Sequence, residues 1–165
     1  MSEFFSSQDL NGKSIISVSN GQIVGEVDDL MVDPDALRVA AIVTSKGSLF
    51  KREVEAIPSE EVEVWGYDVV LVRQPDVIAK EEEQPLVEEW LTVSDQINGK
   101  EVVDTDGTRV GQLEDVVFDT KGQLISYKLS QAFVQDPKIQ SLLIPARATQ
   151  SLGPDVLIID RSILD

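Results

Sequence analysis

The side chains with the most chemical potential are two aspartates, Asp29 and Asp115, which hold the same place in two copies of one motif. The motif reads G-x-x-V-G-x-[V/L]-x-D-[L/V]-x-[V/F]-D, covers residues 21–33 and 107–119, and recurs at an offset of 86 residues. A carboxylate among apolar residues at an irregular point of a strand can accept backbone N–H groups, hold a metal ion or move a proton. We expect the first role, because the rest of the chain gives little support to a metal site or to proton transfer.

The segment Asp104-Thr105-Asp106-Gly107 has the oxygen-rich composition of a calcium loop. If Gly107 stood at the glycine position of an EF-hand loop, Val102 and Leu113 would occupy the first and last ligand positions, where oxygen atoms are required. The EF-hand interpretation therefore fails, and we expect no metal site. Loose calcium binding by so acidic a surface stays an open alternative.

The inventory for catalysis is thin. The chain has no histidine and no cysteine, so it lacks the commonest general base, the commonest transition-metal ligand and every thiolate. It has neither a G-x-x-x-x-G-K-[S/T] loop nor a G-x-G-x-x-G turn. Paired carboxylates could hydrolyse a glycoside, but among 30 acidic residues some are neighbours by chance. We predict a protein that is not an enzyme, with no catalytic residue and no cofactor.

Charge and hydropathy limit the classes of partner. With 30 acidic and 14 basic residues the formal net charge is −16, and such a surface repels phosphate backbones and anionic lipid headgroups. Direct nucleic-acid binding is therefore disfavoured. No window approaches the roughly 18 apolar residues of a membrane span. Residues 1–6 also lack the basic and apolar regions of a secretory signal, so we expect no membrane insertion and a cytoplasmic protein.

The two copies of the motif belong to a longer repeat. Residues 4–13 align with 91–100, Ile57-Pro58 aligns with Ile144-Pro145, and 68–72 align with 155–159. Each unit then covers about 70 residues, which is a small domain and not one turn of a solenoid. We predict a first domain over residues 1–74, a second over 90–165, and between them an acidic linker over 75–89. The two prolines and the glutamates of that linker predict an exposed, partly extended chain.

Each unit has the pattern of several short β-strands and no convincing helix. Hydrophobic residues make up 42% of the chain and aromatic residues only 5%, so Val, Ile and Leu must build the core, and they suit strands. We expect strands over 14–18, 24–32, 38–44, 49–57, 62–65 and 68–72 in the first unit. In the second unit we expect them from 101 to the turn at 107, and over 110–118, 123–129, 141–144 and 155–160.

Four glycines have positional meaning in this pattern. Gly21 and Gly107 end Asn-Gly and Asp-Gly dipeptides, which favour tight hairpin turns. Gly25 and Gly111 lie inside the following strand, where glycine indicates a bulge, a bend or a close backbone contact. We interpret six residues as one repeated structural motif: Gly21, Gly25, Asp29, Gly107, Gly111 and Asp115.

This pattern resembles the PRC-barrel family, and it does so twice. The resemblance is carried by Leu10-Asn11-Gly12-Lys13, the glycine- and aspartate-spaced motif, Ile57-Pro58 and the closing strand at 68–72, each with its counterpart in the second unit. It implies an all-β fold of two tandem small β-barrels, about five to six strands each, joined by the acidic linker.

The PRC-barrel family includes the cytoplasmic domain of the H subunit of photosynthetic reaction centres. It also includes the C-terminal domain of a ribosome maturation factor that binds a small-subunit ribosomal protein. In both settings the barrel is a docking module with no catalytic residues to carry over. These 165 residues show neither the membrane helix of the first nor the separate N-terminal domain of the second, so neither specific role transfers.

Together these observations predict a soluble, non-enzymatic adaptor that binds another protein, for example in a membrane complex of the photosynthetic type. The alternative is a factor in RNA or ribosome metabolism that acts through a basic ribosomal protein, and a homodimer is open in either case. Trp65, Tyr67 and Phe133 form the candidate partner-binding patch, since aromatic side chains often anchor interfaces. Packing in the core or between the barrels is the alternative for each of them.

Overall fold

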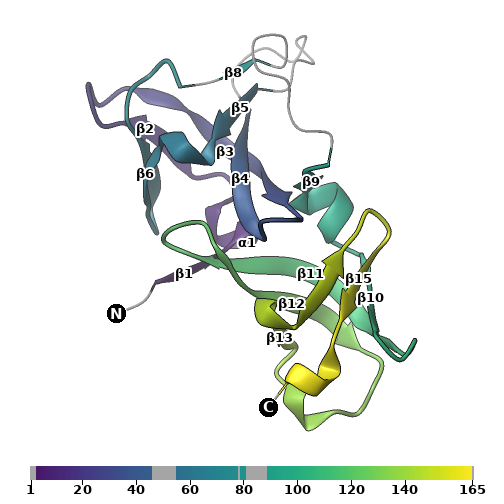
Figure 1. Cartoon of the computed structure of the whole chain (residues 1–165). Helices are drawn as coiled ribbons and strands as arrows, with labels where there is room; N and C mark the ends of the chain where they lie inside the picture. The colour runs from purple at the N-terminus through teal and green to yellow at the C-terminus, as the bar shows by residue number, and fades with distance from the viewer. Residues whose placement is uncertain (1–2, 46–54, 78, 81–88, 165) are drawn as a thin grey trace.

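A computed structural model describes residues 3–45, 55–77, 79–80 and 89–164. Its described part is built from two β-sheets, each formed mainly by one unit of the repeat (Figure 1). Its helical segments are single turns, too short to cross a bilayer. The prediction of an all-β fold with one sheet for each repeat is confirmed.

The first sheet has eight strands, of which six follow one another across the first unit in the order β6-β7-β2-β3-β4-β5. All neighbours are antiparallel except β2 and β7, which run parallel. Their bounds are β2 (Ser14–Ser17), β3 (Ile23–Asp33), β4 (Arg38–Ser45), β5 (Glu55–Pro58), β6 (Val62–Trp65) and β7 (Val69–Val72). The predicted strands match these elements, and residues 49–54 of the fourth prediction lie outside the described residues.

The second unit repeats this topology in the order β14-β15-β10-β11-β12-β13. Here β10 and β15 are the parallel pair. The bounds are β10 (Glu101–Asp104), β11 (Arg109–Asp119), β12 (Leu124–Ala132), β13 (Leu143–Pro145), β14 (Thr149–Leu152) and β15 (Val156–Ile159). In both units a turn of 3-10 helix, η1 (Ser59–Glu61) or η4 (Ala146–Ala148), joins the fourth strand to the fifth. Two further 3-10 turns, η3 (Pro137–Ile139) and η5 (Arg161–Ile163), lie in the second unit.

The units exchange their first strands. The short β1 (Phe4–Ser6) precedes the first sheet in sequence, yet it pairs with β11 of the second sheet. Reciprocally, β9 (Leu91–Thr92) leads into the second unit but pairs with β3 of the first. Each exchanged strand runs into one helical turn, α1 (Ser7–Leu10) or the π-helical η2 (Val93–Ile97). Figure 1 shows both turns in the region where the two sheets meet. The units are therefore interlocked and are not simply adjacent domains on one chain.

The predicted linker contributes to the first sheet. Within it, β8 (Ala79–Lys80) pairs antiparallel with β5, which extends that sheet by one short strand. Val77 is buried in the main hydrophobic cluster. Residues 78 and 81–88, which include the glutamate run, lie outside the described residues. The described part of this segment is therefore packed on the first unit.

One continuous aliphatic core joins the two units. Strands such as β2, β7, β10 and β15 alternate buried and partly exposed residues, as expected for sheets with one covered face. Where the units meet, the rings of Phe5, Trp65 and Phe118 pack together. The ring centroids of Phe5 and Phe118 are 6.0 Å apart, and Trp65 meets Phe118 edge-on with 5.3 Å between their ring centroids. Burial of these rings couples the folding of one unit to that of the other.

The motif glycines occupy turns and a close backbone contact. Gly21 and Gly107 have φ values of +70° and +84°, which side chains other than glycine rarely adopt. At Gly111 an added Cβ would lie 2.5 Å from the carbonyl oxygen of Gln131 on the neighbouring strand. The sequence prediction of hairpin turns and of a close backbone contact within the strand is confirmed at these positions.

Candidate functional site

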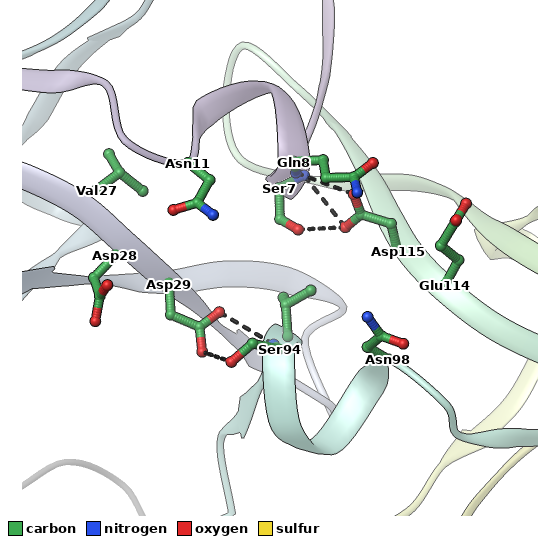
Figure 2. A pocket seen from close by; sticks show the side chains of 11 residues that line it. Ser7, Gln8, Asn11, Val27, Asp28, Asp29, Ser94, Asn98, Glu114 and Asp115 are labelled. Carbon is green, nitrogen blue, oxygen red and sulfur yellow. Dashed lines mark hydrogen bonds between the residues drawn. The ribbon is translucent and has the colours of Figure 1, made fainter.

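A polar pocket of about 180 Å³ lies where the two units meet. Its walls come from α1 and β3 of the first unit and from η2 and β11 of the second (Figure 2). The lining residues form near-symmetric pairs, because each unit contributes the same positions of the repeat. They are Ser7, Gln8, Asn11, Val27, Asp28 and Asp29, together with Val93, Ser94, Asn98, Glu114 and Asp115.

Asp115 anchors the first helical turn of the chain to the second unit. One carboxylate oxygen accepts the N–H of Ser7 at 3.3 Å and the Ser7 hydroxyl, and the other accepts the N–H of Gln8 at 3.1 Å. The carboxylate also accepts the N–H of Val116 at 2.8 Å. The N–H groups of Ser7 and Gln8 are the first backbone donors of α1, and they have no partner within the turn itself. The buried Asp115, only 2% exposed, is thus stabilised by hydrogen bonds from a segment more than one hundred residues away.

Asp29 makes the reciprocal contact. Its carboxylate accepts the N–H of Ser94 at 3.2 Å and the Ser94 hydroxyl at 2.6 Å, and it accepts the N–H of Leu30 at 2.8 Å. Figure 2 shows the two aspartate–serine pairs on opposite sides of the pocket. The pairs differ in burial, because Asp29 is half-buried and Ser94 is exposed. The expected role of both aspartates, acceptance of backbone N–H groups, is confirmed.

A bulge in the long strand of each unit places these carboxylates. The pairing of β3 with β4 shifts between Val27 and Asp29, and the pairing of β11 with β12 shifts between Leu113 and Asp115. The extra residue re-aims the side chain that follows it. Each aspartate therefore reaches across to the other unit's exchanged segment.

The polar groups of the pocket connect the two units. The carboxylate oxygens of Asp29 and Asp115 are already bonded to N–H and O–H donors. Among the described residues no group of three or more acidic side chains is placed to hold a metal ion. The amides of Asn11 and Asn98 line the same pocket. The arrangement explains how the units are held together.

A second charged cluster belongs to the second unit alone. Arg161 donates to Asp104 and to Asp136, both at 3.0 Å, and so ties the C-terminal 3-10 turn to two loops. The N–H of Thr108, together with the Arg161 guanidinium, holds the pKa of the Asp104 carboxyl below its usual value against the effect of burial. The N–H of Lys138 and the same guanidinium lower the pKa of Asp136. Both aspartates in turn raise the pKa of Arg161.

Two other polar groups of the second unit are buried and satisfied. The ammonium group of Lys100 donates to the carbonyl oxygens of Gly153 and Pro154 at 2.8 and 2.9 Å, and its burial lowers its pKa. Tyr127 is fully buried with its hydroxyl 2.7 Å from that of Thr149, and burial raises its pKa to about 12. Both groups therefore form hydrogen bonds inside the second unit.

The three candidate aromatic residues have different environments. Trp65 is 5% exposed and packs on Phe118, so it contributes to the contact between the units and is not available to a partner. Including Trp65 in an exposed patch was therefore wrong, because its ring fills the junction of the two sheets. Tyr67 is 56% exposed with its ring 5.2 Å from that of Phe5, and Phe133 is 49% exposed at the end of β12. These two stay available for binding.

Sequence reasoning did not identify the serines that the aspartates hold. Ser7 and Ser94 are the same residue at the same position of the two copies, and this identity was the available signal. The cluster around Arg161 has no counterpart in the first unit, where Ser17 stands at the position of Asp104. A comparison of the copies alone could not have found that cluster.

The chain was compared with known protein families and with curated proteins. A family model described as PRC-barrel domain matches residues 2–77 and 94–163. The two matched segments correspond to the two units of the repeat and confirm the resemblance seen in the sequence. No curated protein matches the chain.

Proposed function

Because the chain belongs to the PRC-barrel domain family and carries the domain twice, we propose that it is a non-enzymatic docking protein that binds another protein. Domains of this family are often protein-interaction modules. The polar pocket supports the proposal, since its carboxylates hold the two units together and are not set up for a reaction. The interlocked pair then acts as one rigid platform.

The observation that carries the proposal is the exposure of aromatic rings on a strongly acidic protein. Tyr67 and Phe133 are about half exposed, and Phe4 is 46% exposed beside the buried Phe5. Exposed aromatic side chains supply large contact areas with little loss of conformational entropy, and they are enriched in the anchoring positions of interfaces. The net charge of −16 favours a basic partner and speeds its approach.

Two classes of partner fit this surface. We favour a protein of a membrane-associated assembly, such as one of the photosynthetic type. The alternative is a basic ribosomal protein, through which an acidic chain could act on ribosomes without touching RNA. Co-sedimentation with ribosomal particles at low and at high salt separates the two, because absence from those fractions at both salt concentrations removes the ribosomal alternative.

We also infer the finer architecture that the family name implies. The six-stranded path of each sheet curls into a small, partly open barrel, in which η1 and η4 connect the two edge strands without a ladder between them. Residues 75–89 then serve as an acidic connection whose first part packs on the first unit. Small-angle scattering and backbone relaxation of the isotopically labelled chain would test both statements.

The docking proposal is tested by affinity capture with paired variants. The Tyr67→Ala, Phe133→Ala double variant removes the two exposed rings, and Ile23→Ala removes an apolar side chain that is 61% exposed at the start of β3. We expect capture of the same partner by the natural chain and by Ile23→Ala, and loss of at least tenfold in the double variant, a factor of about 1.4 kcal/mol. Equal capture by all three proteins would remove these rings as the docking surface.

A further inference from the structure

The two units differ at one edge of their sheets. In the first unit the outer edge of β5 is covered, because β8 pairs with it through Ala56 and Ala79 and through Glu55 and Lys80. In the second unit the equivalent strand is β13, which pairs with β12 in the way that β5 pairs with β4. No other described strand pairs with β13, and it ends the path of its sheet. Figure 1 shows β8 near β5 at the upper end of the first unit.

The backbone groups on this free edge can be assigned from the register. The carbonyl oxygen of Leu142 accepts the N–H of Leu129 at 2.8 Å and so faces β12, whereas the N–H of Leu142 donates to the carbonyl oxygen of Ile139. Successive residues of a strand direct their N–H and C=O groups to opposite sides. Leu143 therefore directs both groups to the outer edge. Its equivalent in the first unit is Ala56, the residue that faces Ala79 of the added strand.

A hollow of mixed polarity lies beside the residue that precedes β13. It has a volume of about 570 Å³, and its lining includes the apolar Ala132, Val134, Ile139 and Leu142 and the polar Gln135, Asp136 and Gln140. Leu143 itself is 41% exposed. Arg161 donates to Asp136, one of the lining residues, and so ties this loop to η5.

We propose that the outer edge of β13 is a strand-addition site that takes an extended, basic segment of a partner protein. This inference rests on the proposed docking function and names where and how the partner binds. The first unit supplies the template, since the same edge there accepts an antiparallel strand from the chain itself. In this mode backbone hydrogen bonds provide affinity and a neighbouring pocket receives a side chain of the peptide.

The charge of the protein selects among occupants. A net charge of −16 opposes the approach of a second copy through the same edge and favours a segment that carries lysine or arginine. Strand addition also requires free N–H groups along the paired edge of the peptide, so proline at the positions that face β13 prevents it. The occupant is therefore extended, basic and free of proline at the paired positions.

The test uses the full chain, labelled with ¹⁵N, and two synthetic peptides of equal charge. The probe is KVTVTVTVK, and its control is KPPPPPPPK, which keeps the lysines but has no N–H group between them to donate. We expect the probe to shift the amide signals of Leu143 and its neighbours and the control to leave them unchanged. Leu143→Pro removes the outward N–H and should weaken binding of the probe about tenfold, the effect of one lost hydrogen bond.

Two further variants keep the test decisive if the proline variant does not fold. Leu143→Lys leaves the backbone intact and places a positive charge against the basic probe, so it should also weaken binding. Val64→Lys makes the same change on β6, the edge strand at the other end of the first sheet, where Val64 is 47% exposed. That variant should bind like the natural chain.

Three results would overturn the proposal. Equal shifts with the proline peptide would show attraction by charge alone, shifts centred on β6 would place the site elsewhere, and protection of the β13 amides in a homodimer would make a second copy the occupant. Failure of this site is distinguishable from failure of the docking function. If the probe does not bind at β13 while the Tyr67→Ala, Phe133→Ala variant still loses its partner, docking stands and the strand-addition site falls.

Discussion

Replacement of Asp115 by alanine tests whether the aspartate–serine contacts lock the units together. The variant leaves the N–H groups of Ser7 and Gln8 and the Ser7 hydroxyl without their acceptor. A hydrogen bond to a charged group contributes about 1.5–3 kcal/mol, and removal of a carboxylate that is 2% exposed returns part of its desolvation cost. We expect a net loss of about 3 kcal/mol in the free energy of unfolding.

The reciprocal variant Asp29→Ala is the matched control. It removes the acceptor of Ser94, but Ser94 is exposed and its donors can bond to water instead. We expect a loss of only about 1 kcal/mol, since donors that regain water leave no unsatisfied group. The difference between the two variants follows from burial, because the contacts themselves are alike.

Urea unfolding followed by tryptophan fluorescence measures both losses. Trp65 packs on Phe118 across the junction, and Trp90 packs on a small cluster of the first unit, so both report on contacts between the units. The double-mutant cycle of Asp115→Ala with Ser7→Ala should give a coupling energy of about 1–2 kcal/mol. Additive losses for Asp115→Ala and Ser7→Ala, or a larger loss for Asp29→Ala than for Asp115→Ala, would refute the idea that the aspartate–serine contacts hold the units together.

Three further predictions concern single positions. Gly111→Ala should lower the free energy of unfolding by more than about 2 kcal/mol in urea titrations, because its Cβ meets the carbonyl of Gln131 at 2.5 Å; a loss within experimental error would contradict the close contact. Because the pKa of Asp104 is lowered in the folded state, this residue stabilises the fold above its unfolded-state pKa of about 4. The effect is lost as pH falls through the lower folded-state pKa. Arg161→Ala should therefore flatten the loss of stability on acidification, as urea midpoints at a series of pH values would show, whereas an unchanged slope would exclude the ion pair. Because burial raises the pKa of Tyr127 to about 12, the folded state keeps this phenol neutral and loses stability as pH rises above the usual value near 10; Tyr127→Phe should remove that alkaline loss, and urea midpoints of the variant that fall with rising pH as steeply as those of the natural chain would contradict it.

The strands, turns and repeat could be predicted from the sequence because their causes are local. Alternation of aliphatic residues marks the strands, and the Asn-Gly and Asp-Gly dipeptides mark turns in which Gly21 and Gly107 adopt positive φ values. The internal repeat showed that the pattern occurs twice, and the family match covers both copies. The bulges at Asp29 and Asp115 also followed from local signals, a glycine and an acid inside an apolar strand.

Only the tertiary structure decided which segments meet. Periodicity states that residues 4–6 can form a strand but not that they pair with β11 of the other unit, because that pairing depends on backbone groups far apart in the chain. For the same reason the sequence could not say that Trp65 is covered by Phe118, or that β8 closes one sheet edge while β13 leaves its equivalent open. The repeat thus determined two similar sheets, and the long-range pairing determined how they lock and where a partner can add to them.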